Sequence, residues 1–501
     1  MTRKVSQLKA GVILSYFSKM VQLLVGILYT PIMIRLLGQS EYGLYNIAAS
    51  LISYLGILNL GFGSAYIRFY SRYRVAKDRE KISSLNGMFL TLFSLLGVVA
   101  VVSGIILALN VDIIFGPSLN SNELKKAQIL MIILVINLGI SFPNIVFNTY
   151  VQANEHFIAQ NLLLIFRQLS TPMINLPLLI AGHGSVGMVV GTTMINILTE
   201  IVTVIYCFKK LNMKISFNNF DRALFKEMSV YSFYIFINMI VDQVNNNVDK
   251  TILGRYQGVT SVAIYSVGVN LTTYYNQVSS SVSTVFIPRI HRMVASKVNN
   301  LEITKLFTKV GRIQFILLSM VSLGFVFLGK QFISFWVGND YMESYYISLV
   351  LMITITIPGI QNLGIEVQRA KNQHQFRSWM YLFIAIGNII ISIPLSQRFG
   401  SLGAASGTAL SYVLGHGIAM NWYNHQYVGI DMKFFWKEIF SFNKAFILPI
   451  VYGIVINYYG NVDSLKKFLI SGFTYVIIFS LSMWFYGLND YEKKLISKRK
   501  K

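Results

Sequence analysis

The sequence predicts an all-α polytopic membrane protein with about 14 transmembrane helices, arranged as two pseudo-symmetric six-helix lobes plus two extra C-terminal helices. Composition, the spacing of apolar runs and an internal repeat support this fold class. Hydrophobic residues make up 54% of the 501 positions and charged residues only 13%, about half of the ~25% charged share of a soluble domain. So few charges would not cover a surface in water, whereas helices in lipid turn apolar side chains outward.

Long apolar runs separated by short polar breaks predict the individual helices, because each crossing of the hydrocarbon core takes ~20 mostly apolar residues. No break is long enough for a separate soluble domain. The expected helix cores are residues 10–34, 43–66, 86–109, 127–150, 158–181, 186–208, 229–253, 260–285, 307–328, 345–366, 378–396, 402–423, 442–459 and 467–487.

The formal charge of +23 is explained by membrane topology. If the N-terminus is inside, segments on the cytoplasmic side hold 32 of the 43 Lys and Arg residues and segments on the outer side hold nine. Positive charge concentrates on the cytoplasmic side of membrane proteins. We therefore expect both termini in the cytoplasm, a multi-pass protein of the bacterial inner (cytoplasmic) membrane, and no nucleic-acid partner.

An internal repeat with a period near 216 residues divides the chain. The matching pairs are Val151–Phe157 with Val367–Phe376, Gly184–Gly191 with Gly400–Gly407, Pro177 with Pro394, and Leu37–Tyr45 with Leu253–Tyr265. Six helices separate equivalent points, so the halves share one orientation, as in transporters that bind substrate between parallel repeats. The expected domains are an N-terminal lobe at 1–210, a C-terminal lobe at 211–440, and helices 13 and 14 with a basic cytoplasmic tail at 441–501.

Polar residues at membrane depth are the candidate functional groups, because ionisable side chains in lipid are costly unless they serve a function or a pairing. They recur at steps of three and four on single helices, so each set shares one helix face. We expect these faces to surround a water-filled space. The candidate substrate-binding residues are Lys19, Gln22, Arg68, Asn144, Arg167, Asn238, Asn245 and Gln277, and the candidate ion-coupling residues are Glu200, Asp242 and Asp249.

Other motifs do not predict an enzyme or a cofactor. The run from Gly324 to Lys330 begins like a phosphate-binding loop, but Gln331 stands where a Ser or Thr is needed, and the run lies in an apolar helix. The single cysteine, Cys207, excludes a disulfide framework and a cysteine-rich metal site. We expect no metal and no other cofactor.

Essentially the whole chain, including helices 13 and 14, resembles the polysaccharide-transporter proteins of the multidrug/oligosaccharidyl-lipid/polysaccharide exporter superfamily, of which Wzx-type flippases are typical members. The resemblance is carried by Pro31, Arg35, Leu37-Gly38, Glu41–Tyr45, Leu60–Gly63 and Asn246–Gly254. It implies two six-helix lobes that form a V, and alternating access. It also implies an undecaprenyl-diphosphate-linked oligosaccharide that moves from the cytoplasmic to the outer leaflet for O-antigen, capsule or exopolysaccharide synthesis.

The residues fit this implication, since a diphosphate needs cations and Lys19 and Arg167 supply them. The expected partners are the lipid-linked oligosaccharide, membrane lipid, an H⁺ or Na⁺ coupling ion and the polysaccharide polymerase or export machinery. Two alternatives stay open. One is an ion-coupled drug or small-molecule antiporter of the same superfamily, whose cavity would present acids to a cationic substrate. The other is a membrane-embedded polymerase or glycosyltransferase, which would normally need a larger extramembrane loop.

Overall fold

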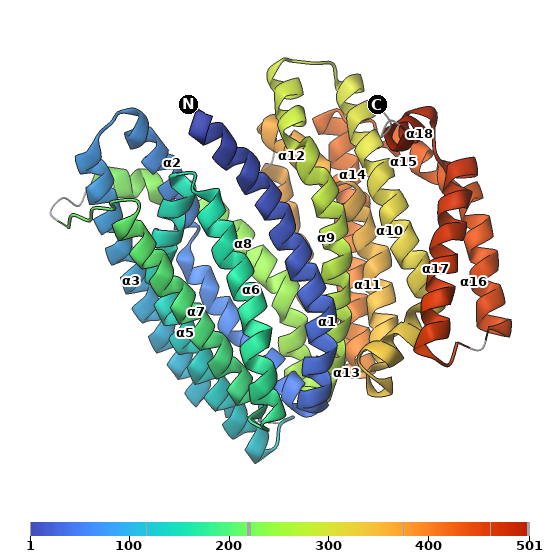
Figure 1. Cartoon of the computed structure of the whole chain (residues 1–501), viewed down its shortest axis with the longest axis horizontal. Coiled ribbons are helices and arrows are strands. Elements are labelled where there is room, and N and C mark those ends of the chain that lie inside the picture. The colour runs from blue at the N-terminus through green and yellow to red at the C-terminus, as the bar shows by residue number, and fades with distance from the viewer. Residues whose placement is uncertain (1, 117, 218–221, 374, 461, 498–501) are drawn as a thin grey trace. The chain divides into compact units, whose positions relative to one another are not determined.

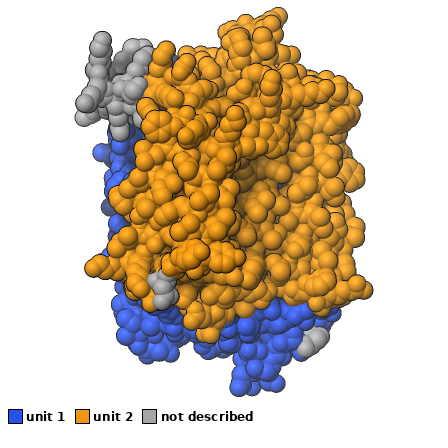
Figure 2. All heavy atoms as spheres, turned by 90° about the vertical axis from the view of Figure 1, so that its right-hand side faces the viewer, with its two compact units in different colours: residues 1–263 blue, residues 264–501 orange. Residues whose placement is uncertain are grey.

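Helices joined by short turns make up the computed structural model, which describes residues 2–116, 118–217, 222–373, 375–460 and 462–497. Over these residues there is no β-strand, and the predicted all-α class is confirmed. The chain forms two compact units, Met1–Ala263 and Ile264–Lys501 (Figure 2). This division places the seventh predicted helix in the first unit. The three-part division with a boundary at residue 210 stays a prediction.

The first unit is built from long helices (Figure 1). They are α1 (Thr2–Leu55), the 3₁₀ turn η1 (Gly56–Asn59), α2 (Phe62–Val75), α3 (Arg79–Leu109), the short α4 (Val111–Phe115), α5 (Ser121–Ala153), α6 (Phe157–Ile180), α7 (Gly184–Lys209) and α8 (Arg222–Tyr256). The helix α9 (Val259–Ala295) begins in this unit and continues into the second. Buried aromatic rings of α2, α3 and α5 form the core, with Tyr66 packed edge-on to Phe89 at 5.0 Å between centroids.

The second unit continues with α10 (Asn300–Trp336) and the 3₁₀ turn η2 (Asn339–Tyr341). It then contains α11 (Glu343–Ile360), α12 (Asn362–Ala370), α13 (Gln375–Tyr412), η3 (Val413–Ala419), α14 (Met420–Tyr423), η4 (Asn424–Val428), α15 (Met432–Phe440), η5 (Ser441–Phe446), α16 (Ile447–Tyr459), α17 (Leu465–Ser482), η6 (Met483–Gly487) and α18 (Asp490–Ser497). The turns η3, η4 and η6 are π-helical. Phe442 and Phe479, from the two extra helices, pack against α10 through Phe315 and Met320.

The helices agree with the predicted membrane crossings. Eleven helical stretches of the described residues are long and apolar enough to span a membrane. Two of these, Ala10–Val75 and Gln375–Val428, hold two predicted crossings each, separated at Gly38 and Gly400. The eighth predicted crossing corresponds to α9, which is not among these eleven stretches and is rich in Ser, Thr and Asn. The chain is therefore a multi-pass membrane protein.

The second predicted helix, expected to be continuous over residues 43–66, is interrupted. Leu60 and Gly61 adopt left-handed backbone angles, with φ of 54° and 72°. A Cβ on Gly61 would lie 2.6 Å from Cγ2 of Ile235, so the turn needs glycine both for its φ and for the close approach of α8.

Left-handed turns recur at the repeat spacing. Positive φ values between 48° and 82° occur in five pairs of residues separated by 216–220 positions, namely Gly38 and Gly258, Lys77 and Lys297, Glu155 and Asn372, Gly184 and Gly400, and Asn212 and Gly429. Helices thus end at equivalent points in both halves. The pairing of Gly38 with Gly254 that the sequence suggested is wrong in detail, because Gly254 is helical and Gly258 makes the turn.

Candidate functional site

The seam between α1 and α6 carries two of the predicted cations. Gly11 allows the helices to approach closely, because a Cβ there would lie only 2.6 Å from Cβ of Phe157. The Asn161 amide donates to the carbonyl of Gly11 at 3.3 Å, and the Ser18 hydroxyl donates to Oε1 of Gln168 at 3.5 Å. These contacts fix the register of the two helices.

Lys19 and Arg167 lie at the same level along this seam. Lys19 follows Ser18 and Arg167 precedes Gln168, so each is the chain neighbour of the residue that bridges the helices. Both side chains are exposed, and so is Gln22, one turn further along α1. Lys19 is nine residues beyond Ala10, the start of the predicted crossing, which is about 14 Å of helix and about half of a ~30 Å hydrocarbon core. The two cations are thus held at mid-membrane depth on one unit.

Glu200 of α7 lies in a polar cluster with α5 and α6. Its carboxylate accepts hydrogen bonds from the Ser141 hydroxyl at 2.7 Å and from the Asn144 amide at 3.3 Å. The guanidinium of Arg167 acts on the same carboxylate electrostatically. The structure therefore brings together three predicted site residues, Asn144, Arg167 and Glu200, from three different helices. Oδ1 of Asn144 is buried and has no hydrogen-bond partner.

The polar face of α5 is directed toward α7 rather than toward open space. Asn137 accepts a hydrogen bond from Asn196 at 3.4 Å, one level above the Glu200 cluster. Asn144 is only 8% exposed. Asn137, Ser141 and Asn144 thus pair with a neighbouring helix of the same unit, and the expectation that this helix face borders a water-filled space stays a prediction. Asn144 as a substrate ligand stays a prediction.

Arg68 of α2 contacts the start of α8. Its guanidinium lies over the ring of Tyr231 with 4.7 Å to the centroid, and the side chain is exposed. One turn away, Arg72 pairs with Glu227 at 3.7 Å. These contacts connect α2 to α8, and Arg68 remains exposed.

The predicted residues of α8 differ in burial although they share a face by spacing. Asp242 is exposed, Asn238 and Asn245 are half-buried, and Asp249 is 3% exposed. Gln277 of α9 belongs to the second unit and is half-buried. Gln277 and the α8 residues stay predicted site residues.

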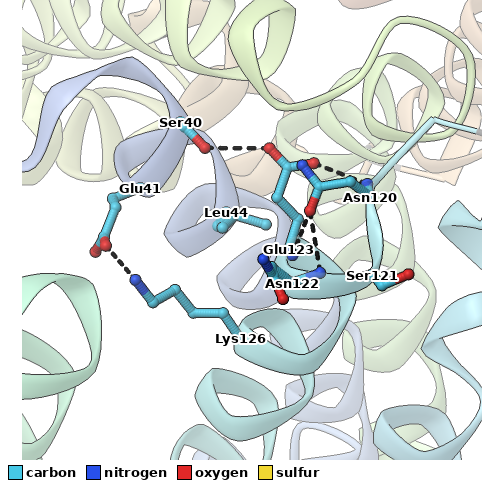
Figure 3. Close-up of a pocket in the computed structure, with 8 residues that line it drawn as sticks. All are labelled: Ser40, Glu41, Leu44, Asn120, Ser121, Asn122, Glu123 and Lys126. Carbon is cyan, nitrogen blue, oxygen red and sulfur yellow. Dashed lines mark hydrogen bonds and ion pairs between the residues drawn. The ribbon is translucent and has the colours of Figure 1, made fainter.

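A polar cavity of about 420 Å³ lies in the first unit, where α1 resumes after Gly38 beside the N-terminus of α5 (Figure 3). Glu41 forms an ion pair with Lys126 and accepts a hydrogen bond from the backbone N–H of Ser185 at 2.6 Å. The Ser40 hydroxyl donates to Glu123 at 3.2 Å. These contacts join α1, just after its kink at Gly38, to the N-terminal turns of α5 and α7.

Sequence reasoning missed two buried charged groups in the second unit. Arg312 of α10 pairs with Glu492 of α18 at 2.7 Å and with Glu438 of α15 at 3.1 Å. Arg377 of α13 is 5% exposed and lies over the ring of Tyr381, which contacts His416 in the π-helical turn η3. A lone Arg at the edge of an apolar run was the available signal. No group of His, Cys, Asp and Glu that could hold a metal ion occurs within the described ranges.

Comparison with known proteins places this geometry in context. The family model of the polysaccharide biosynthesis proteins matches residues 8–294, more than half of the chain. A relative named "Putative O-antigen transporter", from Shigella flexneri, is 21% identical over 389 residues, which cover 76% of this chain and 89% of that protein.

Solved structures share the fold. A lipid II flippase, MurJ, in an inward closed conformation superposes with a TM-score of 0.77 at 17% sequence identity, covering 97% of this chain and 99% of that one. An inward-facing multidrug resistance transporter of the MATE family, in the MOP superfamily, gives a TM-score of 0.57 at 14% identity, covering 83% of this chain and 99% of that one. At such low identity these matches show the architecture alone.

Proposed function

Because the chain belongs to the polysaccharide biosynthesis protein family, the polysaccharide-transporter branch of the multidrug/oligosaccharidyl-lipid/polysaccharide exporter superfamily, we propose that it is a flippase for a lipid-linked oligosaccharide. Its substrate is an undecaprenyl-diphosphate-linked unit, moved from the cytoplasmic to the outer leaflet for O-antigen, capsule or exopolysaccharide synthesis. The protein lies in the bacterial inner membrane with both termini in the cytoplasm, and it transports rather than catalyses.

The main support for this proposal is that Lys19 and Arg167 lie at the same level along α1 and α6. Two exposed cations held at one level, about halfway into the membrane, match the charge of a diphosphate. Arg offers a fork of donors to phosphate oxygens and Lys a compact point charge, so the pair supplies both modes of anion binding. Gln22 and Arg68 add donors on α1 and α2, and the sugar hydroxyls find partners among Asn238, Asn245 and Gln277.

Energy coupling is assigned to the carboxylates. The positive charge of Arg167 acts on the Glu200 carboxylate. A diphosphate that binds Arg167 therefore competes with Glu200 for that charge. Glu200 is then free to take up a proton or sodium ion. Asp242 and Asp249 of α8 are the other coupling candidates. A drug antiporter of the same superfamily is the competing function, and it predicts a cationic substrate.

The test is transport in proteoliposomes that contain a labelled undecaprenyl-diphosphate oligosaccharide. We expect protein-dependent movement of the labelled lipid across the bilayer, reduced at least tenfold in Lys19→Ala and Arg167→Ala and less in Lys19→Arg. Lys209→Ala, which removes an exposed cation at the end of α7, is the matched control and should transport normally. Full transport by both alanine variants, or transport of cationic drugs instead, would contradict the proposal.

A further inference from the structure

A single carboxylate lies at membrane depth among α5, α6 and α7. It belongs to Glu200, which is half-buried on α7. The other acidic residue of these three helices, Glu123, lies in the first turn of α5, before the apolar run of that helix. A charge at membrane depth is costly unless it is compensated or can be neutralised. The groups around Glu200 therefore determine what its carboxylate can bind.

The neighbours of Glu200 present hydrogens and positive charge to the carboxylate. The Ser141 hydroxyl donates to Oε1 at 2.7 Å, and the Asn144 amide donates to Oε2 at 3.3 Å. The same amide nitrogen also donates to the carbonyl of Ile140 at 3.1 Å, which keeps it turned toward acceptors. Arg167 adds a positive charge. Hard cations are bound by several oxygen lone pairs directed at one point, so this arrangement matches a sodium ion poorly.

A proton fits the same arrangement. The hydroxyl of Ser141 is both a donor and an acceptor, and its distance of 2.7 Å from Oε1 suits an O–H···O bond with the hydrogen on either oxygen. The hydroxyl donates to the ionised carboxylate. When Glu200 is protonated, the same oxygen accepts the new hydrogen, and the serine hydroxyl turns toward a backbone carbonyl of its own helix. Both forms of Glu200 thus have a hydrogen-bond partner.

We propose that Glu200 takes up a proton, rather than sodium, when an anion occupies Arg167, and that Ser141 is the positioning residue that satisfies both forms. This inference rests on the proposed function and identifies its coupling ion. While Arg167 is unoccupied, its charge stabilises the ionised carboxylate. An anion on Arg167 cancels that charge, and a proton from water then adds to a carboxylate oxygen and neutralises Glu200. By linkage, a proton on Glu200 strengthens anion binding to the same extent.

Few other charges act on this position. The helix α7 packs against α5, α6 and α1. The apolar run of α5 has no charged residue, and the charged side chains of the other two helices at membrane depth are Arg167 on α6 and Lys19 and Arg35 on α1. Lys and Arg keep their charge near pH 7, and the tyrosines of these helices stay neutral. Two histidines, His156 and His183, lie in the turns at the two ends of α6, so the variant Glu200→Gln is needed to isolate the carboxylate.

Binding of labelled undecaprenyl-diphosphate oligosaccharide to the purified protein tests the coupling ion. We expect the wild-type protein to bind at least fivefold more tightly at about pH 6 than at about pH 8, equally in sodium and in potassium buffers. Glu200→Gln, which mimics the neutral form, should bind tightly at both pH values. Glu80→Gln is the matched control, because Glu80 is exposed in the first turn of α3, and it should keep the wild-type pH dependence.

The outcomes separate this inference from the proposed function. If the wild-type protein does not bind the labelled lipid at either pH, the proposed function fails. If it binds and the affinity follows sodium, does not depend on pH, or keeps its pH dependence in Glu200→Gln, only the proton assignment fails.

The role of Ser141 has its own measurement, the midpoint of the pH profile of binding. A hydrogen bond to an ionised acceptor is stronger than one between neutral groups, so Ser141→Ala should disfavour the ionised form and move the midpoint upward by about one pH unit. Ser141→Thr keeps a hydroxyl and should restore the wild-type midpoint. A merely structural role would weaken binding equally at both pH values, and an unchanged midpoint in Ser141→Ala would overturn the assignment.

Discussion

Replacing Arg312 by methionine tests how α15 and α18, which flank the two extra helices, are held to α10. The guanidinium makes a double contact with Glu492, through Nε at 2.7 Å and Nη2 at 3.0 Å, and a further contact with Glu438 at 3.1 Å. It also donates to the carbonyls of Glu438 and Gly487 at 2.9 and 3.0 Å. The side chains of Arg312 and Glu492 are each 4% exposed. One cation thus joins α10, α15 and α18.

Arg312→Met should lower the stability of the protein because it leaves the buried Glu492 carboxylate without its cation. Removing one partner of a buried ion pair costs about 3–5 kcal/mol, because the other charge is left uncompensated. In Arg312→Met, Glu492 keeps its hydrogen bond from the backbone N–H of Asn489 and loses both charged donors. Glu438 is 34% exposed and regains water, so it adds little. At ~2–4 °C per kcal/mol for a domain of this size, the unfolding midpoint should fall by roughly 6–20 °C.

Thermal unfolding of the purified protein in detergent, followed by near-UV circular dichroism, measures this shift. Lys305→Met is the matched control, since it breaks an exposed pair with Glu302, and such pairs contribute only about 0–1 kcal/mol. Combining Arg312→Met with Glu492→Leu should recover most of the midpoint, because an apolar replacement of a buried pair is close to neutral. A midpoint in Arg312→Met no lower than in Lys305→Met would refute the reasoning.

Two further predictions concern topology and coupling. Single cysteines at Ser118 and Gln257 should react with an impermeant thiol reagent added outside whole cells. Reaction at either position only after lysis would contradict the proposed orientation. Asn461, a third position expected outside, is not among the described residues. Asp242→Asn should retain substrate binding and lose the dependence of transport on an ion gradient. If Asp242 only balances the charge of Lys19, the double variant Asp242→Asn with Lys19→Gln should instead transport better than either single variant. Unchanged gradient-dependent transport in Asp242→Asn would exclude both roles of Asp242, ion coupling and charge balance.

Positions along one helix could be predicted from the sequence, and contacts between helices could not. The apolar runs located the crossings that the eleven apolar stretches of the described residues contain, and the three-and-four spacing put Ser141 and Asn144 on one face of α5. Which neighbour that face meets depends on helix rotation and packing, and the structure directs it to Glu200. The contacts of Arg312 were harder still to predict from the sequence. Its partners lie 126 and 180 residues further along the chain, so a lone Arg at the edge of an apolar run can be noticed in the sequence, but its partners cannot be identified there.

The repeat duplicates backbone turns without duplicating charge, and this difference bears on mechanism. Gly184 and Gly400 make the same left-handed turn, yet Ile384, buried in the second half, stands near the position equivalent to Arg167. Likewise Leu92 stands near the position equivalent to Arg312. Because the fold tolerates an apolar residue at either place, neither arginine is required to form the repeat. Arg312 is explained by α15 and α18, which it joins to α10. Arg167 interacts electrostatically with Glu200 of the same half, and its roles in anion binding and coupling stay predictions.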